Sequence, residues 1–348
     1  MRCSSIADLR APKQKTNRRN AEPAMLRGVL VYPRRPTTCQ REMNKVLQEI
    51  IDLLDVEPID ENLFRGQNHN TEHVFGGQVL AQALASAFRT VDNSQQLHSL
   101  HSYFLRAGDW TRPILYEVDR IRDGRSFSTR RVAAIQNGRT IFTLACSWQK
   151  PEEGLDHTLP MPDVPPPESL RGDLETYTEL AKTQPEMARF TFRFDAIDSR
   201  AVERITMMNQ GEHPPYKHTW LKARDALPDN PEVHLALLAY MSDLDFMSTS
   251  MLPHGPLAAD ANGERTILGA SLDHAIWFHR PFRADEWLLF AKESPNAGGA
   301  RGFVRGHFFN RAGEMVATAA QECLIRPVGE ARVALETKAA VAAKSSAP

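Results

Sequence analysis

The sequence from residue 98 onwards contains one strand-rich pattern twice, and this repeat limits the folds that the chain can adopt. Residues 98–148 and 271–323 share an order of strand-like segments. Placing Gly138 on Gly313 aligns the two copies at an offset of 175 residues, and His101 then falls near His274. A repeat of this length is typical of a duplicated structural unit. The sequence therefore predicts two similar modules within one chain.

A helix-like segment precedes the strands of each copy. VFGGQVLAQALASAF and HLALLAYMSDLDFM carry apolar residues at helical spacing, at 74–88 and 234–247. The following segments resemble strands, and Asp123-Gly124 and Asn137-Gly138 are placed as hairpin turns in the first copy, so a meander is expected. One long apolar helix wrapped by a curved antiparallel sheet is the hotdog arrangement. We therefore predict an α+β double hotdog, two tandem repeats of this unit.

Composition divides the chain into five parts. Residues 1–42 hold ten Lys or Arg, three Asp or Glu and four prolines, and are predicted to be a disordered basic extension. A leading helix and the first module occupy residues 43–150, and a linker with six prolines in its first 20 residues covers 151–189. The second module is assigned to 190–327 and an Ala-rich tail to 328–348.

The sequence also limits the cellular compartments and the binding partners that we expect for this protein. No apolar run reaches the roughly 18 residues that a membrane-spanning helix needs, and no secretory signal follows the basic N-terminus. The end SSAP differs from the SKL-type peroxisomal address, so we expect a cytoplasmic protein. The basic excess lies in the extension, which disfavours nucleic acid as a partner. Neither metal-ligand nor disulfide spacing is found in the four cysteines, which are Cys3, Cys39, Cys146 and Cys323.

The chain resembles the acyl-CoA thioesterase II family, which includes bacterial and peroxisomal members. The resemblance covers about residues 43–327 in unbroken order. It implies a double hotdog that assembles into homo-oligomers, dimers or tetramers, and hydrolyses fatty acyl-CoA to fatty acid and CoA without a cofactor. The segments that carry it are LFRGQ, VFGGQVLAQAL, HSYFLRAGD, RDGRSFSTRRVAAIQNG, SDLDF, LDHAIWFHRPF, EWLLF, ARGFVRG and VATAAQE.

Asp243 interrupts the apolar face of the second predicted helix. It follows Leu235 and Ala239 at intervals of four residues, with Phe246 and Met247 on the same stripe. An unpaired buried carboxylate costs several kcal/mol, so Asp243 is either a hydrogen-bonded helix residue or part of a polar cavity. The resemblance places the catalytic aspartate of the family, in SDLDF, on Asp243.

Ser271 and Gln321 stand in strand-like segments of the second copy. From pattern alone, the serine is a turn or backbone partner and the glutamine a solvent-facing residue. The resemblance instead places the family's catalytic hydroxyl on Ser271, where some members carry threonine, and its glutamine on Gln321. An aspartate, a hydroxyl and an amide suit direct attack of water on a thioester, with Asp243 accepting the proton.

Several weaker candidates stay outside this site. His98 and His101 are three apart in one strand, so alternation predicts opposite faces. Gly76 and Gly77 open the first helix, where backbone amides could meet the substrate or the glycines could simply allow close packing. Some arginines could bind the CoA phosphates, although a solvated face explains them equally: Arg122, Arg125, Arg130, Arg131, Arg301 and Arg305.

Other functions compatible with the fold are a hotdog enoyl-CoA hydratase or dehydratase and a noncatalytic acyl-CoA-binding sensor. The first requires an acid/base pair, commonly Asp with His, at the α and β carbons of the substrate. The second predicts tight binding without turnover. A serine nucleophile is disfavoured because GRSFS at 124–128 lacks the closing glycine of a GxSxG elbow.

Overall fold

The computed structural model describes residues 43–68, 74–205, 211–255, 266–329 and 332–333. The predicted basic extension and most of the predicted tail therefore lie outside the described residues. Within those ranges, no helix is both long and apolar enough to cross a bilayer.

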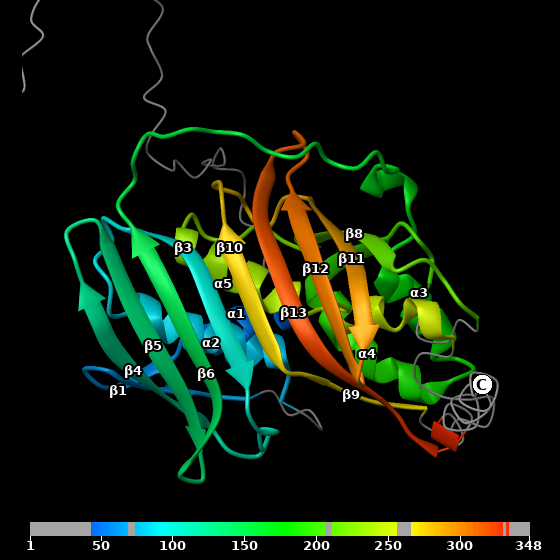
Figure 1. Cartoon of the computed structure of the whole chain (residues 1–348), viewed down its shortest axis with the longest axis horizontal. Helices are drawn as coiled ribbons and strands as arrows, with labels where there is room; N and C mark the ends of the chain where they lie inside the picture. Colours follow the sequence, from blue (N-terminus) through cyan, green and yellow to red (C-terminus); the bar gives the residue numbers. More distant parts are fainter. Residues whose placement is uncertain (1–42, 69–73, 206–210, 256–265, 330–331, 334–348) are drawn as a thin grey trace, which may run out of the picture.

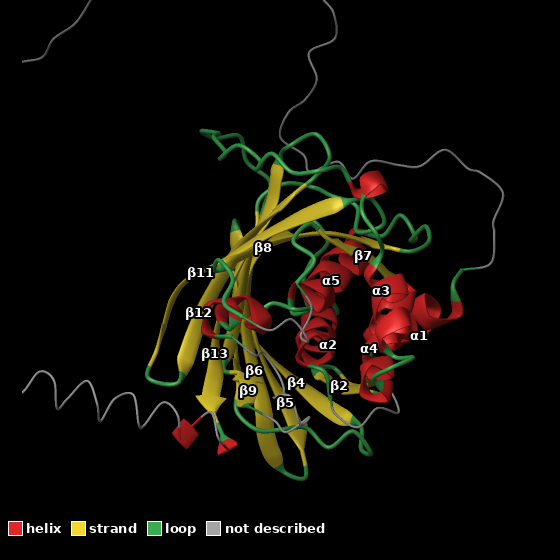
Figure 2. Ribbon diagram, turned by 90° about the vertical axis from the view of Figure 1, so that its right-hand side faces the viewer, coloured by secondary structure: helices red, strands yellow, loops and turns green. Residues whose placement is uncertain are grey.

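A single sheet of 13 strands runs through both modules, and all of its strand pairs are antiparallel. The helices gather on one face of this sheet, which curves around them (Figures 1 and 2). Helices α2 (Gly76–Phe88) and α5 (Pro231–Ser242) lie closest to the concave face. This arrangement confirms the predicted α+β double hotdog.

The strands of the first module are ordered β1-β2-β4-β5-β6-β3. Strand β3 pairs with β6 instead of β4, so the predicted meander is correct only for β4 to β6. The predicted Asn137-Gly138 turn joins β5 to β6, with φ of 51° and 68° at the two residues. The bounds are β1 (Glu57–Asp60), β2 (Leu63–Gly66), β3 (Gln96–Phe104), β4 (Ile114–Asp123), β5 (Phe127–Gln136) and β6 (Arg139–Gln149).

The second module repeats this order as β7-β8-β11-β12-β13-β10, and β9 adds to β13. The two modules meet where β3 pairs with β10, in a contact that we call the module junction; Ser102 lies opposite His274 there. The bounds are β7 (Ile197–Ala201), β8 (Tyr216–Ala223), β9 (Ile267–Ser271), β10 (Asp273–Phe278), β11 (Leu288–Gly298), β12 (Arg301–Phe309) and β13 (Met315–Pro327).

Both central helices are buried almost all round, because the sheet covers one side and other helices pack on the other. The predicted leading helix is α1 (Lys45–Leu54), which buries Leu47, Ile50 and Leu54. The Pro-rich stretch is extended only as far as Pro166. It continues as a short 3-10 turn and then α3 (Asp173–Leu180) and α4 (Ala188–Ala196), so helices begin inside the range predicted as a linker.

Helix α5 is shorter than its apolar pattern predicts. It ends at Ser242, and Asp243 is the capping residue that follows, with φ of −88° and ψ of −3°. Asp245 then has a positive φ of 54°, which turns the chain away from the helix. The expectation that Asp243 lies within the helix was therefore wrong by one residue, and its side chain is presented at a helix end.

Candidate active site

Asp243 lies where the end of α5 meets the start of α2. Its Oδ2 atom accepts a hydrogen bond of 2.9 Å from the backbone N–H of Gly77. Nearby, the rings of Phe75 and Tyr240 are in edge contact at 5.0 Å. The two helices therefore run antiparallel, and the positive end of the α2 dipole faces the carboxylate and stabilises its charge.

Close approach of the two helices requires glycine at the start of α2. A Cβ atom on Gly76 would lie 2.7 Å from Asp243 Oδ2, and one on Gly77 would lie 2.5 Å from the backbone oxygen of Tyr240. Real Cβ contacts are not this short. The paired glycines predicted to pack closely therefore do so, and they let the Gly77 N–H reach Asp243.

Replacement of Gly77 by alanine should destabilise the fold, because the new methyl group meets backbone that cannot rotate away. We expect a loss of about 1–3 kcal/mol in the free energy of unfolding, typical of overpacking. Urea unfolding followed by circular dichroism measures it. Gly154→Ala is the matched control, since Gly154 is exposed and a Cβ there meets nothing within 4 Å. Equal stability of the two variants would contradict the close approach.

Gln321 connects Ser271 to the interior of the second module. Its Nε2 atom donates to Ser271 Oγ at 2.8 Å and to Cys323 Sγ at 3.3 Å. The Gln321 side chain is 0% exposed, so it does not face solvent as its pattern alone suggested, whereas Ser271 is half-buried. Both amide hydrogens of Gln321 are thus used within the protein. The Ser271 hydroxyl keeps its own hydrogen for another acceptor.

His274 holds the other end of the Gln321 amide. Its Nδ1 lies 2.6 Å from Gln321 Oε1, and its Nε2 lies 2.9 Å from Ser242 Oγ. An amide oxygen only accepts, so Nδ1 donates to Gln321. Burial lowers the pKa of His274 to about 4, so the ring is neutral at pH 7 and Nε2 is its acceptor nitrogen. The Ser242 hydroxyl lies 2.9 Å from this nitrogen and 2.8 Å from the Ala239 carbonyl oxygen, and its one hydrogen can be donated to only one of them at a time. The line Ser242–His274–Gln321–Ser271 is fixed by hydrogen bonds.

The electrostatics of Cys323 indicate that Asp243 lies near the hydrogen-bonded chain of Ser242, His274, Gln321 and Ser271. Burial raises the pKa of the Cys323 thiol to about 12; the hydrogen bond from Gln321 opposes this, and the negative charge of Asp243 adds to it. The carboxylate is therefore close enough to act on a thiol that itself contacts Gln321. Ser242, which bonds His274, is also the chain neighbour of Asp243. Asp243 therefore lies near the thiol that contacts Gln321, and Gln321 bonds Ser271; the catalytic role that the resemblance assigns to these three residues stays a prediction.

Two members of this neighbourhood, Ser242 and His274, were not predicted as site residues. Both are fully buried, and both owe their contacts to packing between α5 and β10. One feature of the sequence could have indicated His274. Side chains alternate between the two faces of a strand, and His274 shares the inward face of β10 with the apolar residues Ile276 and Phe278.

Of the weaker candidates, Gly76 and Gly77 lie against Asp243, whereas the two histidines lie elsewhere. His98 bonds Ser147 at 2.9 Å and His101 contacts the ring of Trp277. A bulge in β3 between Leu97 and Ser99 puts both histidines on the outer face, so the prediction of opposite faces was wrong. Four of the arginines pair with carboxylates of neighbouring strands: Arg130 with Asp123, Arg131 with Asp119, Arg301 with Glu322 and Arg305 with Glu293.

Asp245 has a different environment from Asp243 although only one residue separates them. Its carboxylate contacts the buried ammonium of Lys217, lies 3.8 Å from that of Lys292 and bonds the Ser248 hydroxyl. Burial alone would raise the pKa of Asp245, but the two lysines outweigh it and lower that pKa to about 2. We assign Asp245 to the stability of the fold. In the described part of the chain, no three His, Cys, Asp or Glu side chains are grouped to hold a metal ion.

Comparison with known proteins finds similarity along both modules. The family described as "Acyl-CoA thioesterase N-terminal domain" matches residues 65–149, and the family described as "Acyl-CoA thioesterase" matches residues 187–324. Acyl-coenzyme A thioesterase 8 of Mus musculus is 38% identical over 290 residues, which cover 80% of this chain and 88% of that protein. Acyl-CoA thioesterase 2 of Haemophilus influenzae is 38% identical over 289 residues, with coverage of 82% and 99%.

A solved structure shows the same similarity in three dimensions. The acyl-CoA thioesterase II TesB2 from Mycobacterium marinum superposes with a TM-score of 0.67 at 40% sequence identity, and the match covers 81% of this chain and 99% of that one. Sequence and structural similarity therefore extend over the same two modules.

Proposed function

The chain belongs to the acyl-CoA thioesterase family, and on that premise we propose that it hydrolyses fatty acyl-CoA to a free fatty acid and CoA by direct attack of a water molecule. The observation that supports this mechanism is the division of the site into exposed and buried parts. Asp243 and Ser271 are half-buried, whereas Gln321 and His274 are 0% exposed. Only the first two can meet a substrate; Gln321 bonds Ser271, and His274 bonds Gln321.

Asp243 is the proton acceptor in this proposal. A thioester carbonyl is electrophilic enough for water to attack once a carboxylate removes a proton from it. The attacking oxygen bonds the carbonyl carbon, and the C–S bond then breaks with its electron pair going to sulfur. The CoA thiolate takes the proton held by Asp243, so the acid and the CoA thiol are released and the carboxylate is regenerated. The Gly77 N–H donates to this carboxylate, and the positive end of the α2 dipole faces it.

Ser271 is the hydrogen-bond donor to the water or to the oxyanion that develops on the carbonyl. Its Oγ already accepts from Gln321, so its hydrogen points to a different partner. Gln321 in turn is held by His274 through Oε1. We therefore assign Gln321 and His274 to the positioning of Ser271, and the Ser271 hydroxyl to direct contact with the reacting atoms.

Removal of the Ser271 hydroxyl should slow hydrolysis, and threonine should restore it. Loss of one donor to a developing oxyanion typically lowers kcat by about 100- to 1,000-fold, so Ser271→Ala should fall in that range. Ser271→Thr keeps a hydroxyl that Gln321 can reach and should retain most of the rate. Steady-state release of CoA, followed with a thiol-reactive dye, measures both variants. Equal activity of the alanine and threonine variants would contradict the role of the hydroxyl.

The hydratase alternative is disfavoured by the state of His274. A hydratase needs a histidine that reaches the substrate, but both ring nitrogens of His274 are bonded inside the protein and the ring is 0% exposed. His98 and His101 lie on the outer face of the sheet. No other histidine among the described residues hydrogen-bonds the Asp243, Ser271 and Gln321 group.

The test of the proposed function is CoA release from a panel of short-chain to long-chain acyl-CoAs, together with a spectroscopic assay for hydration of an enoyl-CoA. We expect thiol release from saturated acyl-CoA and no loss of the enoyl double bond. Hydration without release would identify a hydratase, and tight binding without either reaction would identify a sensor.

We also propose that the chain acts in the cytoplasm as a homo-oligomer, a dimer or tetramer. Support for association comes from Tyr103 and Trp277, which leave 59% and 37% of their surfaces exposed on adjacent strands of the sheet's outer face. Light scattering coupled to size-exclusion chromatography tests the assembly, and fractionation of cells tests the compartment.

A further inference from the structure

A cavity of about 120 Å³ lies in the second module, between α3 and the strands β7, β8 and β11 (Figure 1). Its lining includes two exposed arginines, Arg171 and Arg204. The lining also includes three buried side chains, which are Lys217, Thr219 and Lys292. The cavity therefore extends from the protein surface to the face of the sheet that the helices cover.

Two buried lysines of this cavity lie opposite each other on adjacent strands. Lys217 on β8 is in register with Lys292 on β11, and the two are 6% and 2% exposed. Like charges at such positions repel each other, so the pair requires negative charge nearby. The carboxylate of Asp245 contacts the Lys217 ammonium but lies 3.8 Å from that of Lys292. One carboxylate is thus shared unequally between two ammonium groups.

The other carboxyl of the lining, Asp173, is bonded to different partners. Its oxygens accept from the Ser199 hydroxyl and, at 3.4 Å, from the Ala201 N–H. Burial raises the pKa of Asp173, so ionisation of this carboxyl is less favourable than ionisation of Asp245. Asp173 therefore does not replace the counter-charge that Lys292 lacks.

Cations outnumber carboxyls in the lining. The cationic side chains are Arg171, Arg204, Lys217 and Lys292, against Asp173 and Asp245. Two carboxylates just outside the lining have partners of their own, because Glu175 pairs with Arg171 and Glu203 with His218. Among the described residues, neither Arg204 nor Lys292 has a carboxylate oxygen at hydrogen-bond distance. These two cations are free to attract an anion.

The buried part of the cavity also has hydrogen-bond donors without an acceptor among the described residues. The Thr219 hydroxyl has no partner there, and Lys292 donates one long hydrogen bond, of 3.4 Å, to the Asp245 carbonyl oxygen. Lys217 and Thr219 share one face of β8, and Thr219 is the diagonal neighbour of Lys292 across the strand pair. Because buried donors are costly to leave unpaired, a bound acceptor would stabilise this group.

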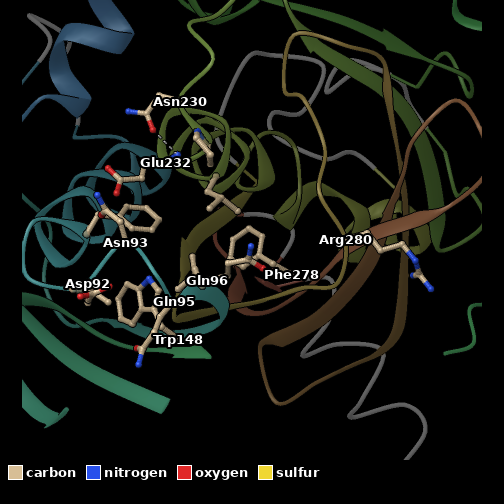
Figure 3. Close-up of a pocket in the computed structure, with 14 residues that line it drawn as sticks. Asp92, Asn93, Gln95, Gln96, Trp148, Asn230, Glu232, Phe278 and Arg280 are labelled. Carbon is tan, nitrogen blue, oxygen red and sulfur yellow. Dashed lines mark hydrogen bonds between the residues drawn. The ribbon is translucent and has the colours of Figure 1, made fainter. Parts of the chain in front are cut away.

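A larger cavity elsewhere in the chain has the opposite distribution of charge. It has a volume of about 360 Å³ and lies between the start of α5, the end of α2 and the first residues of β3 (Figure 3). Its mouth carries the carboxyls of Asp92 and Glu232, and its one arginine, Arg280, is directed away and pairs with Asp156. The excess of cations is therefore specific to the smaller cavity.

A phosphate group matches the smaller cavity in charge, in hydrogen bonding and in size. It is anionic, its oxygens accept several hydrogen bonds, and lysine and arginine are its usual partners. The volume of about 120 Å³ is below the roughly 300–1,000 Å³ of ordinary ligand pockets. The cavity can thus hold a small ion or the end of a larger molecule, but not a whole nucleotide.

We propose that the cavity beneath α3 is a binding site for a phosphate group, which the Lys292 ammonium and the Thr219 hydroxyl hold, with Arg204 at the mouth. Two sources offer this chemistry, free orthophosphate and the 3′-phosphate of CoA. The site rests on the cavity and its unpaired donors. Only the CoA source rests on the proposed function.

Calorimetric titration of the full-length chain with potassium phosphate at constant ionic strength tests the site. Thr219→Val removes a hydroxyl that has no partner among the described residues, so the variant should stay folded. We expect it to bind phosphate at least about tenfold more weakly, as loss of a hydrogen bond to a charged group predicts. The matched control is Thr249→Val, which removes another buried, unpartnered hydroxyl outside this lining and should bind as the native chain does.

Lys292→Met provides a second test, because it removes one ammonium group and leaves Asp245 paired with Lys217. We expect a larger loss of phosphate affinity than in Thr219→Val. If Lys292→Met does not fold, the comparison of Thr219→Val with Thr249→Val decides the question.

Titration with CoA and with dephospho-CoA, which lacks the 3′-phosphate, distinguishes the two sources. Weaker binding of CoA but not of dephospho-CoA by Thr219→Val would identify the CoA phosphate, and an effect on orthophosphate alone would identify the free ion. Equal affinity of Thr219→Val and Thr249→Val for all three compounds, or no binding of any of them by the native chain, would overturn the proposal. A native chain that binds orthophosphate but releases no CoA would retain this site and reject the proposed hydrolysis.

Discussion

Replacement of Asp243 by asparagine is expected to lower kcat for CoA release by roughly 100- to 10,000-fold, the usual contribution of a general base. Asparagine keeps the oxygen that accepts from the Gly77 N–H, so the contact between α2 and α5 should persist. It cannot take a proton from water. The KM should change much less than kcat, since the carboxylate acts on the attacking water and not on the bound acyl chain.

Asp273→Asn is the matched control for this experiment. Asp273 also lies near Cys323 and its side chain bonds the backbone N–H of Glu322, not Asp243, Ser271 or Gln321, although its chain neighbour is His274. The Asp273→Asn substitution removes one negative charge from the same neighbourhood, and we expect this variant to keep most of the native rate. A similar fall in both variants would show that the charge of the region, and not a base at Asp243, controls the rate. Circular dichroism spectra confirm that each variant is folded.

Replacement of Asp245 by asparagine is expected to cost about 3–5 kcal/mol in the free energy of unfolding, because it leaves buried ammonium groups without their counter-charge. Lys217 and Lys292 are 6% and 2% exposed, and Asp245 is the carboxylate that both approach. Chemical denaturation measures the loss. The control is Asp119→Asn in the exposed Arg131 pair, where we expect a change of about 0–1 kcal/mol.

The same carboxylate gives a pH dependence of stability whose sign follows from its pKa. The pKa of Asp245 falls from its ordinary value of 3.8 to about 2 in the folded chain. The folded state therefore binds the proton less readily than the unfolded state. The stabilisation is complete above about pH 4 and disappears as the pH falls through 2. In Asp245→Asn this part of the acid denaturation curve should be absent, and an unchanged curve would contradict the ion pair.

The local sequence pattern was sufficient to predict most helices, strands and turns. It was insufficient to predict which strands pair with one another. The Asn137-Gly138 turn was predictable because both positions need a positive φ, which these residues adopt easily. The pairing of β3 with β6 and of β3 with β10 was not predictable from the residues, since it depends on contacts distant in sequence. Helix α3 was missed within a Pro-rich stretch, although Pro167 at the start of the preceding 3-10 turn is a common helix-start signal.

The candidate site shows the same limit. Asp243, Ser271 and Gln321 came from resemblance, and the structure adds that Gln321 bonds Ser271. Apolar periodicity could not locate the end of α5, because Leu244 and Phe246 continue the buried pattern beyond Ser242. The contact of His274 with Ser242 depends on packing of a helix against a strand 32 residues away, which a single sequence does not reveal.

The module junction also determines how the chain tolerates being cut. If the halves were separated, β3 and β10 would each expose an unpaired edge, nine and six residues long, and such edges promote aggregation. A protease that cleaves the exposed segment 151–160 would instead leave every strand pair intact. The nicked protein should therefore remain a single folded particle. The backbone hydrogen bonds between β3 and β10 would hold its two pieces together without a peptide bond between them.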